Sequence, residues 1–289
     1  MPEGDTVWRT AERLHRALAG QPLTALELRW GDLGALDLLP ATTTAVRARG
    51  KHLLHELDSG VTIHSHLKME GSWRIAATAE VTRRTRANPQ LRILAETAAW
   101  SALGLRLGLV EVWPSSESAT RLAYLGPDIL GPDWDPESAV ANLHRQPATA
   151  IGVALLDQRN LAGIGTFWAA EALFRYRRNP WTAAVESTRD DLESLVEWTQ
   201  GMMRRSAATG HQTSTGRTER DATAYVHGRS GRPCRRCGTT VRVAPLGQAP
   251  RARVFFYCPS CQGGLAPTDE GTTQVPLGAS GVKSPRRRR

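Results

Sequence analysis

Four cysteines constrain the fold of this chain more than any other feature. They form two Cys-x-x-Cys pairs separated by twenty residues, and they are Cys234, Cys237, Cys258 and Cys261. This spacing is typical of a four-thiolate zinc site carried on the two knuckles of a β-ribbon. Disulfides are disfavoured in a cytosolic protein, and a redox Cys-x-x-Cys motif needs no duplicate. We therefore predict one structural zinc ion, whose four protein ligands leave no coordination position open for catalysis.

The formal net charge is +9, and its distribution along the chain is uneven. Lys and Arg balance Asp and Glu over residues 1–220, whereas residues 221–263 hold seven arginines against Asp221. Residues 264–289 add a smaller excess from Lys283 and the run Arg286 to Arg289. This clustering favours an acidic polymer as partner, nucleic acid above all, over a merely solvated basic surface.

A chain of 289 residues is long enough for two domains and a small third one. It has no run of eighteen apolar residues, and its first residues are not a charged segment followed by an apolar one. We therefore expect a soluble, cytoplasmic protein with no membrane partner.

Short apolar or alternating runs, separated by turn residues, predict strands in the N-terminal half, as in a sandwich or a barrel. The expected strands cover residues 43–49, 52–57, 61–67, 91–95 and 103–113. Arg47, Arg49 and Lys51 alternate, so they project to one face, which meets either phosphates or solvent. His64 and His66 resemble a metal pair, but no third ligand is near, and we interpret them as strand histidines.

From residue 125 onward the pattern becomes helical. Helices are expected over residues 135–145, 150–157, 167–175 and 186–205, followed by a linker over residues 206–224. The segment Gly163-Ile164-Gly165 predicts a turn at a helix N-terminus, where backbone N–H groups suit a phosphate. Many Gly-x-Gly segments are simple turns, so this motif alone does not decide its role.

The first residues suggest covalent chemistry, although many proteins begin Met-Pro for no chemical reason. Removal of Met1 leaves Pro2 as a terminal secondary amine, and an α-amino group titrates near ~8, so part of it is nucleophilic at neutral pH. Attack on an aldehyde carbon gives an iminium, an electron sink, and Glu3 is a candidate proton carrier. An amphipathic helix is predicted over residues 6–18 with Asp5 or Thr6 as N-cap, and its dipole disfavours the ammonium form of the amine.

Together these segments resemble the formamidopyrimidine-DNA glycosylase/endonuclease VIII family of base-excision repair enzymes. The resemblance covers about residues 1–262. It rests on Pro2-Glu3-Gly4-Asp5-Thr6, Gly50-Lys51-His52-Leu53-Leu54, His64-Ser65-His66-Leu67, Leu125-Gly126-Pro127-Asp128, residues 155–165 and the cysteine segment, in the family's order. The first of these motifs and the lack of an Asp-Pro-Arg-Arg-Phe-Gly loop near residues 100–115 favour the endonuclease VIII branch, of actinobacterial type.

The resemblance implies an α+β fold in four parts. These are an N-terminal catalytic β-sandwich with an N-terminal helix (1–122), a helix-two-turns-helix DNA-binding domain (123–220), a β-ribbon zinc finger (221–263) and a disordered basic tail (264–289). It also implies a monomer that binds double-stranded DNA containing oxidised bases or abasic sites, with the damaged base flipped out of the duplex.

The resemblance further implies roles for individual residues. Pro2 attacks the sugar C1′ and forms a Schiff base, Glu3 protonates the ring oxygen, and Lys51 contacts the phosphate and assists sugar opening. Asn160 and Arg253 grip the flanking phosphates, and Arg253 belongs to the catalytic set. The remaining DNA contacts come from Gly163, Gly165 and Met69, the last as a wedge in the vacated stack or, alternatively, as a loop-packing methionine.

The function implied is that of a bifunctional glycosylase and abasic-site lyase that removes oxidised pyrimidines and cuts the strand by β,δ-elimination. Two alternatives are a glycosylase for oxidised purines, such as 8-oxoguanine or formamidopyrimidines, and a non-catalytic protein that binds damaged or abasic DNA. The chain departs from the family in having Thr166 where asparagine is usual, which weakens the expected phosphate contact there. Lys68 and Glu70 flank Met69 where other polar or aromatic residues are common.

Overall fold

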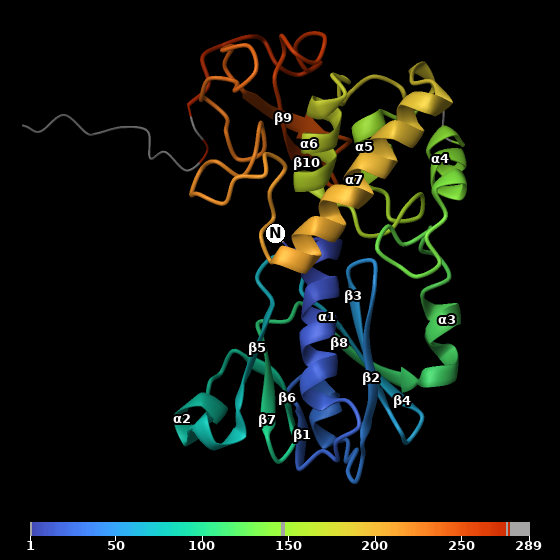
Figure 1. Ribbon diagram of the computed structural model, residues 1–289, viewed down its shortest axis with the longest axis vertical. Coiled ribbons are helices and arrows are strands. Elements are labelled where there is room, and N and C mark those ends of the chain that lie inside the picture. Colours follow the sequence, from blue (N-terminus) through green and yellow to red (C-terminus); the bar gives the residue numbers. More distant parts are fainter. Residues whose placement is uncertain (1, 146–147, 276, 278–289) are drawn as a thin grey trace, which may run out of the picture. The chain divides into compact units, whose positions relative to one another are not determined.

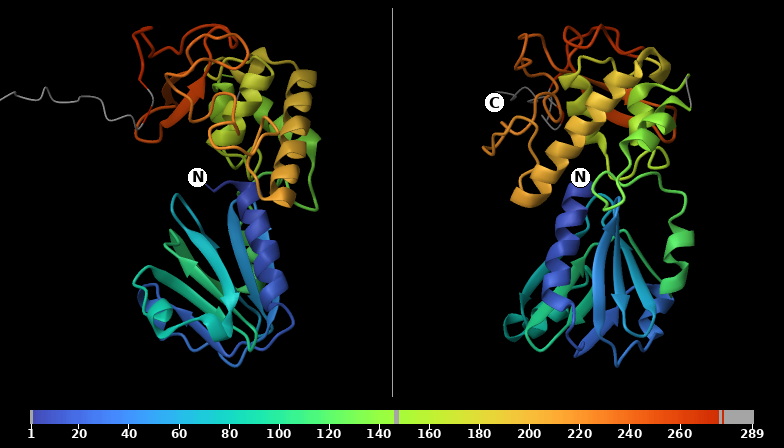
Figure 2. Two further views of the ribbon diagram at one scale, coloured as in Figure 1. Left: turned by 60° about the vertical axis from the view of Figure 1, so that its left-hand side comes forward. Right: turned by 45° about the vertical axis from the view of Figure 1, so that its right-hand side comes forward.

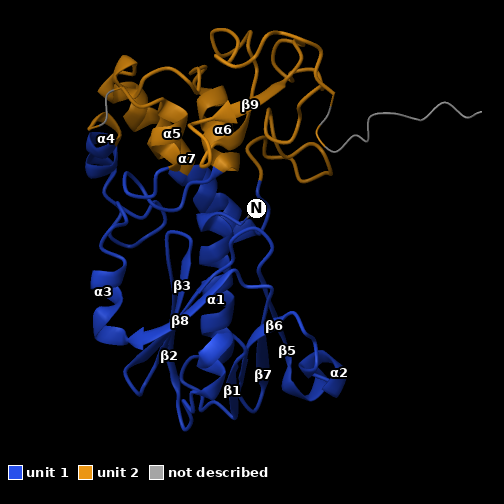
Figure 3. Ribbon diagram, turned by 180° about the vertical axis from the view of Figure 1, so that it is seen from behind, with its two compact units in different colours: residues 1–142, 157–165, 200–212 blue, residues 143–156, 166–199, 213–289 orange. Residues whose placement is uncertain are grey.

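A computed structural model describes residues 2–145, 148–275 and 277 (Figure 1). The chain forms two compact units, coloured separately in Figure 3. Unit 1 comprises residues 1–142, 157–165 and 200–212, and unit 2 comprises residues 143–156, 166–199 and 213–289. Within the described part of the chain, no helix combines the length and the apolar character needed to cross a bilayer.

Unit 1 contains two four-stranded antiparallel sheets, which confirms the predicted β-sandwich (Figure 2). One sheet has the order β2-β3-β4-β8, with strands Thr43–Arg49, His52–Leu57, Val61–His66 and Leu109–Pro114. The other has the order β1-β6-β7-β5, with strands Ala25–Leu28, Leu91–Glu96, Trp100–Leu105 and Ser72–Ala77. The predicted run 103–113 is divided between β7 and β8, which are joined by a turn at Arg106, whose φ of 50° is left-handed.

The first helix, α1 (Gly4–Leu18), supplies part of the core of the sandwich. Its stripe Val7, Ala11, Leu14 and Leu18 is buried among residues of both sheets, as the helical spacing predicts. The shorter helical segments of unit 1 are α2 (Arg83–Arg86), α3 (Ser118–Arg121) and the 3-10 turns Gly31–Ala35, Thr78–Glu80 and Ser115–Glu117.

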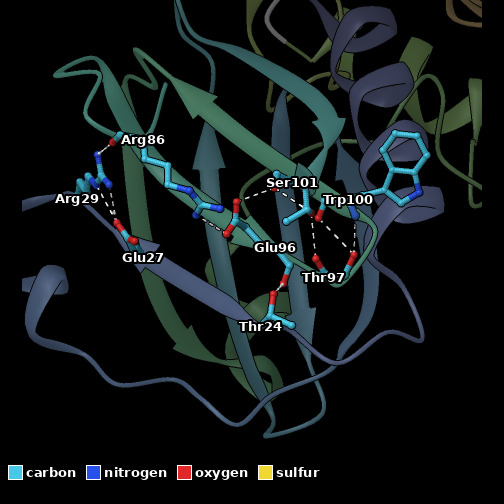
Figure 4. Close-up of polar contacts among 9 residues, drawn as sticks. Thr24, Glu27, Arg29, Arg86, Glu96, Thr97, Trp100 and Ser101 are labelled. Atoms are coloured by element: carbon cyan, nitrogen blue, oxygen red, sulfur yellow. Dashed lines mark hydrogen bonds and ion pairs between the residues drawn. The ribbon is translucent and has the colours of Figure 1, made fainter. Parts of the chain in front are cut away.

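A buried carboxylate ties the β1-β6-β7-β5 sheet to helix α2 (Figure 4). Glu96 is 3 % exposed, pairs with Arg86, and accepts a hydrogen bond from Ser101 Oγ at 2.6 Å. Arg29 donates to the Arg86 carbonyl at 2.5 Å and pairs with Glu27 at 2.6 Å. Because the buried charge is paired and hydrogen-bonded, this network holds α2 on the sheet rather than destabilising it.

Unit 2 is built on helices followed by a two-stranded ribbon. The helices in this part of the chain are α4 (Pro136–His144), α5 (Ile151–Leu156), α6 (Thr166–Arg175), the 3-10 turn Ala184–Glu186 and α7 (Arg189–Thr209). Helices α4 and α7 each also contribute residues to unit 1. The last helix extends four residues beyond the predicted end at 205, into the segment expected to be a linker.

The ribbon pairs β9 (Arg242–Leu246) with β10 (Arg253–Tyr257), close to the predicted hairpin. Glu171 on α6 is fully buried and accepts the backbone N–H groups of Tyr225, Val226 and His227 at 2.8–2.9 Å, so α6 holds the turn segment that precedes the ribbon. Burial raises the pKa of Glu171, and these hydrogen bonds oppose that shift.

Residues 264–275 are packed on the ribbon, contrary to the predicted disorder of 264–289. Asp269 pairs with the buried Arg242 and accepts a hydrogen bond from Tyr257 Oη at 2.5 Å. Gln274 exchanges hydrogen bonds with the backbone of Val243 at 2.8 and 2.9 Å. Polar composition suggested a solvated tail, but these side chains are satisfied inside the protein. Lys283 and Arg286 to Arg289 lie outside the described residues.

Candidate functional site

The candidate site begins at the N-terminus of α1. Pro2 is half-buried, and Glu3, in extended backbone, is the N-cap residue. The prediction of Asp5 or Thr6 as N-cap was wrong, because Gly4 donates its N–H to Gly163 O at 2.8 Å and Val7 N–H already reaches Glu3 O at 3.0 Å. The helix therefore starts next to Pro2, and its positive end adjoins the residue expected to be the nucleophile.

The Glu3 side chain is 1 % exposed and is held by the glycine turn. Gly165 donates its N–H to Glu3 Oε2 at 2.9 Å. A Cβ on Gly165 would lie 2.4 Å from the Glu3 carboxyl carbon, so only glycine leaves room for this carboxylate. The N–H group that the sequence assigned to a phosphate thus orients Glu3 instead.

The Gly163 amide is also used inside the protein. It donates to Gln158 Oε1 at 3.0 Å, while Gln158 Nε2 donates to Ile164 O at 3.0 Å. Gly163 has φ +107°, which requires glycine, and a Cβ on Gly4 would lie 2.9 Å from Gly163 Cα. The Gly-x-Gly segment therefore acts as a close-packed support for the start of α1.

Asp5 anchors this end of the helix. Its side chain is buried and accepts hydrogen bonds from Ser206 Oγ at 2.6 Å and from Gln212 Nε2 at 3.2 Å. Both donors lie about 200 residues away in sequence, so sequence reasoning missed them. The consecutive residues Glu3, Gly4 and Asp5 thus each make a different tertiary contact.

Lys51 lies on the β2–β3 turn, which is attached to the same loop. Gly50, with φ +57°, donates its N–H to Asp128 Oδ2 at 2.7 Å, and a Cβ on it would lie 2.9 Å from Ala162 Cβ. Burial raises the pKa of Asp128, and the hydrogen bond from Gly50 counters that shift. Unit 1 therefore brings Pro2, Glu3 and the Lys51 turn together around residues 162–165.

The two arginines that precede Lys51 are occupied by protein partners. Arg47 pairs with Glu56 at 3.6 Å, and Arg49 lies 3.5 Å from Asp133 and donates to Gly126 O at 3.3 Å. Arg49, one of the three residues predicted to share a face, therefore links strand β2 to residues 126–133.

Asn160 lies at the start of the glycine-containing loop and is 6 % exposed. Its carbonyl accepts a hydrogen bond from Asn142 Nδ2 at 3.0 Å. The motif at 125–128 runs beside this loop, since Ala162 N–H donates to Pro127 O at 2.8 Å and Ile129 N–H to Ala162 O at 3.1 Å. The backbone around Asn160 is thereby fixed from two sides.

A chain of hydrogen-bonded side chains, unforeseen from the sequence, adjoins the Lys51 turn. Tyr124 Oη lies 3.1 Å from His52 Nε2, His52 Nδ1 lies 2.8 Å from His64 Nε2, and His64 Nδ1 lies 2.9 Å from Glu111 Oε2. Burial, followed by neighbouring positive groups, lowers the pKa of His52 to about 3. His64 and His66 lie on β4 as predicted. Burial lowers the pKa of His64, and its hydrogen bond with Glu111 opposes that shift.

Met69 occupies the tight β4–β5 turn. Its side chain is 62 % exposed, Lys68 has φ +52°, and Gly71 donates its N–H to Leu67 O at 2.9 Å. This exposure favours the wedge interpretation of Met69, which stays a prediction.

Unit 2 holds the four cysteines and Arg253. The four sulfur atoms all lie within 4.8 Å of one another, with 3.9 Å between Cys234 and Cys261 and 3.5 Å between Cys237 and Cys258. A tetrahedron of ~2.3 Å bonds separates its sulfur ligands by about 3.8 Å, so these thiols fit one metal ion. Arg253 opens β10 with an exposed side chain.

Two matches account for most of the chain. Residues 1–102 match the formamidopyrimidine-DNA glycosylase N-terminal domain, and residues 125–218 match the formamidopyrimidine-DNA glycosylase H2TH domain. The chain is 43 % identical to the probable endonuclease 8 2 of Streptomyces coelicolor, over 95 % of this chain and 99 % of the relative. The chain belongs to the formamidopyrimidine-DNA glycosylase family.

Other similar proteins support the same family assignment. The DNA-(apurinic or apyrimidinic site) lyase Nei2 of Mycolicibacterium smegmatis is 42 % identical, covering 91 % of this chain and 99 % of that protein. Endonuclease 8 of Escherichia coli is 30 % identical, covering 91 % and 100 %. Lactococcus lactis formamidopyrimidine-DNA glycosylase, solved non-covalently bound to DNA containing an abasic site, has the same fold, with a TM-score of 0.75, 20 % identity and coverage of 90 % and 99 %.

Proposed function

We propose that this protein is a bifunctional DNA glycosylase and abasic-site lyase of base-excision repair that removes oxidised pyrimidines. The observation that carries the proposal is the arrangement of Pro2, Glu3 and the Lys51 turn around one glycine-containing loop. Relatives at 42 % and 43 % identity, named as a lyase of abasic sites and as an endonuclease 8, support the reaction class. The choice of oxidised pyrimidines over oxidised purines follows from the resemblance of residues 2–6 to the endonuclease VIII branch.

In this proposal the Pro2 nitrogen, exposed by loss of Met1, attacks C1′ of the damaged nucleotide. The C1′–N bond to the base breaks, and the base leaves with the bonding electrons and takes up a proton. Glu3, oriented by the Gly165 N–H, protonates the sugar ring oxygen as the C1′–O bond opens. The resulting iminium at Pro2 acidifies the 2′ protons, so elimination of the 3′ and then the 5′ phosphate cuts the strand on both sides.

The remaining residues of the site are proposed to bind the DNA. Lys51 contacts the phosphate of the damaged nucleotide, and Asn160 and Arg253 hold the flanking phosphates as charge-assisted or polar donors. Met69, exposed on a tight turn, fills the space left by the flipped nucleotide. Gly163 and Gly165 act through the support of Glu3 and α1, and the DNA contact first expected of them is not part of this proposal.

The metal ion that suits the cysteines is zinc, because four thiolates at tetrahedral spacing are its usual structural ligands. Zinc bound here would fix the ribbon that carries Arg253, and all four ligand positions are protein side chains. Pro2, Glu3 and Lys51 lie in unit 1 and Arg253 lies in unit 2, and none of the proposed reaction steps passes through the metal. We further propose the four-part division at residues 122, 220 and 263, and a monomeric enzyme acting on double-stranded DNA.

The test is borohydride trapping on a duplex with a single abasic site. Wild-type protein should give a covalent adduct that mass spectrometry maps to Pro2, and Pro2→Gly should abolish rapid trapping. A wild-type protein that forms no adduct would instead be the non-catalytic binder of damaged DNA. Matched duplexes with thymine glycol, dihydrouracil or 8-oxoguanine decide the lesion, and faster release of 8-oxoguanine would replace the pyrimidine assignment with the purine one.

A further inference from the structure

A groove unconnected with the candidate active site runs along α1 in unit 1. At one end is a hollow of about 340 Å³ lined by Arg13, Arg16, Ala17, Ile75 and Trp100. Trp100 is 45 % exposed, and Figure 4 shows its indole directed away from the Glu96 network. Hydrogen bonds of 2.8 and 2.9 Å between Thr97 and the Trp100 backbone fix the turn that carries the indole.

The groove continues toward the start of the helix. A neighbouring hollow of about 460 Å³ shares Arg13 and Arg16 with the first and adds Trp8, Arg9 and Glu12. A third, of about 390 Å³, shares Trp8 and is lined mainly by apolar groups, including Leu130 and Pro132. Shared residues join the three hollows into one surface that has the arginines of α1 in its middle. Ile75 and Trp100 lie at one end, and Leu130 and Pro132, with Arg204, at the other.

The three arginines of the basic middle share their hollow with one carboxylate, that of Glu12. Arg9, Arg13 and Arg16 repeat at i, i+4 and i+7, so their side chains follow one face of α1. Among the residues described by the structure, no carboxylate forms an ion pair with any of the three, whereas Arg121 and Arg189 on other helices pair with glutamates at i−4 and i+4. Arg16 donates only to a backbone carbonyl, that of Glu12, at 3.3 Å.

We propose that this groove binds an acidic peptide segment with an apolar residue at each end. Charge complementarity favours an anion along the arginines, and the two tryptophan-lined hollows offer sites for apolar side chains. From Trp8 to Arg16 the helix rises about 12 Å, which an extended peptide spans in about four residues.

A nucleic acid strand fits this surface less well. Its phosphates are continuous, so one of them would face Glu12 in the middle of the stripe. The aliphatic lining by Ile75, Leu130 and Pro132 offers no hydrogen-bonding groups for base edges. A peptide avoids both problems because it can place a neutral residue opposite Glu12.

The test measures fluorescence anisotropy with labelled Leu-Asp-Gln-Asp-Asp-Trp, in which glutamine is the neutral residue, its uncharged analogue Leu-Asn-Gln-Asn-Asn-Trp, and a labelled dodecathymidylate. The acidic peptide should bind saturably with a Kd below about 100 µM at low salt, and the neutral analogue should not bind. The double variant R13E/R16E should weaken binding at least about tenfold, and Trp100→Ala should weaken it separately. The exposed pair R83E/R84E on α2, which reverses the same charge elsewhere, should change nothing.

Absence of saturable peptide binding, or equal weakening by R83E/R84E, would overturn the proposal. Tighter binding of dodecathymidylate that R13E/R16E abolishes would identify the groove as a nucleic-acid track and would also overturn it. Circular dichroism checks that each variant is folded. Should R13E/R16E fail to fold, the peptide affinities of Trp100→Ala and R13Q/R16Q are compared with that of the wild type instead. Neither result depends on the proposed repair reaction.

Discussion

Replacing Gly165 by alanine should separate the positioning of Glu3 from the binding of DNA. The added Cβ would lie 2.4 Å from the Glu3 carboxyl carbon and 2.5 Å from Oε1, whereas ordinary contact begins at 3.4 Å. The Glu3 carboxylate must therefore move by about 1 Å, and the 2.9 Å hydrogen bond from the Gly165 N–H is lost or distorted. A displacement of this size at a reacting group costs about 100-fold in rate.

The assay is single-turnover borohydride trapping on an abasic-site duplex, with duplex affinity measured in parallel. We expect the trapping rate of Gly165→Ala to fall about 100-fold, while the Kd changes less than about threefold because no proposed phosphate contact is removed. The rate should not recover at saturating protein concentration.

Gly201→Ala is the matched control. Gly201 lies in α7, and a Cβ there meets nothing within 4 Å, so this variant should keep full activity and gain up to about 1 kcal/mol of stability from helix propensity. A Gly165→Ala protein that traps at the wild-type rate would contradict the role of this glycine in orienting Glu3. A loss of folding in Gly165→Ala but not in Gly201→Ala would assign Gly165 a structural role instead.

Three further outcomes follow from other parts of the molecule. Arg253→Ala should weaken binding of all duplex sequences alike and lower the slope of log Kd against log salt by about one; an unchanged slope removes Arg253 from the phosphate contacts. Cys237→Ser should lose the metal ion, measured as zinc per protein, and lose DNA binding, while the circular dichroism of the β-sandwich persists; retained zinc argues against the four-thiolate site. Burial lowers the pKa of His55 to about 4, so the unfolded chain takes up a proton near pH 6.5 that the folded protein takes up only near pH 4. As the pH falls from about 6.5 to about 4, the free energy of unfolding should therefore decrease by up to about 1.4 kcal/mol per pH unit because of this residue. Urea unfolding of His55→Gln should show a correspondingly weaker dependence of this free energy on pH.

Local patterns predicted most of the secondary structure correctly. The stripe of α1, strands β2 and β3 and the cysteine spacing depend on neighbours within a few residues, so the periods of helix, strand and turn are visible in the chain. Pro2 and Glu3 were candidates from the chemistry of the first residues, and the family resemblance supplied the detailed roles of Pro2, Glu3 and Lys51.

Predictions failed where a residue in a locally recognisable pattern contacts a residue far away in the sequence. Gly165 was assigned to a phosphate, but its N–H donates to Glu3, 162 residues away. Residues 264–275 were expected to be disordered because they are polar, yet Asp269 is satisfied by Arg242 and Tyr257. A hydrogen bond between remote residues leaves no periodic trace in the sequence.

The amino-acid sequence alone determined which residue types are present, the course of the helices and strands, and the metal-binding spacing of the cysteines. Only the tertiary structure decided what each candidate contacts: Gly4 lies on Gly163, Gly50 is bound to Asp128, and Asp5 is anchored by Ser206. The physical reason is that helices, strands and turns arise from interactions over a few residues, whereas the orientation of a catalytic side chain depends on close packing between segments that are far apart in the sequence.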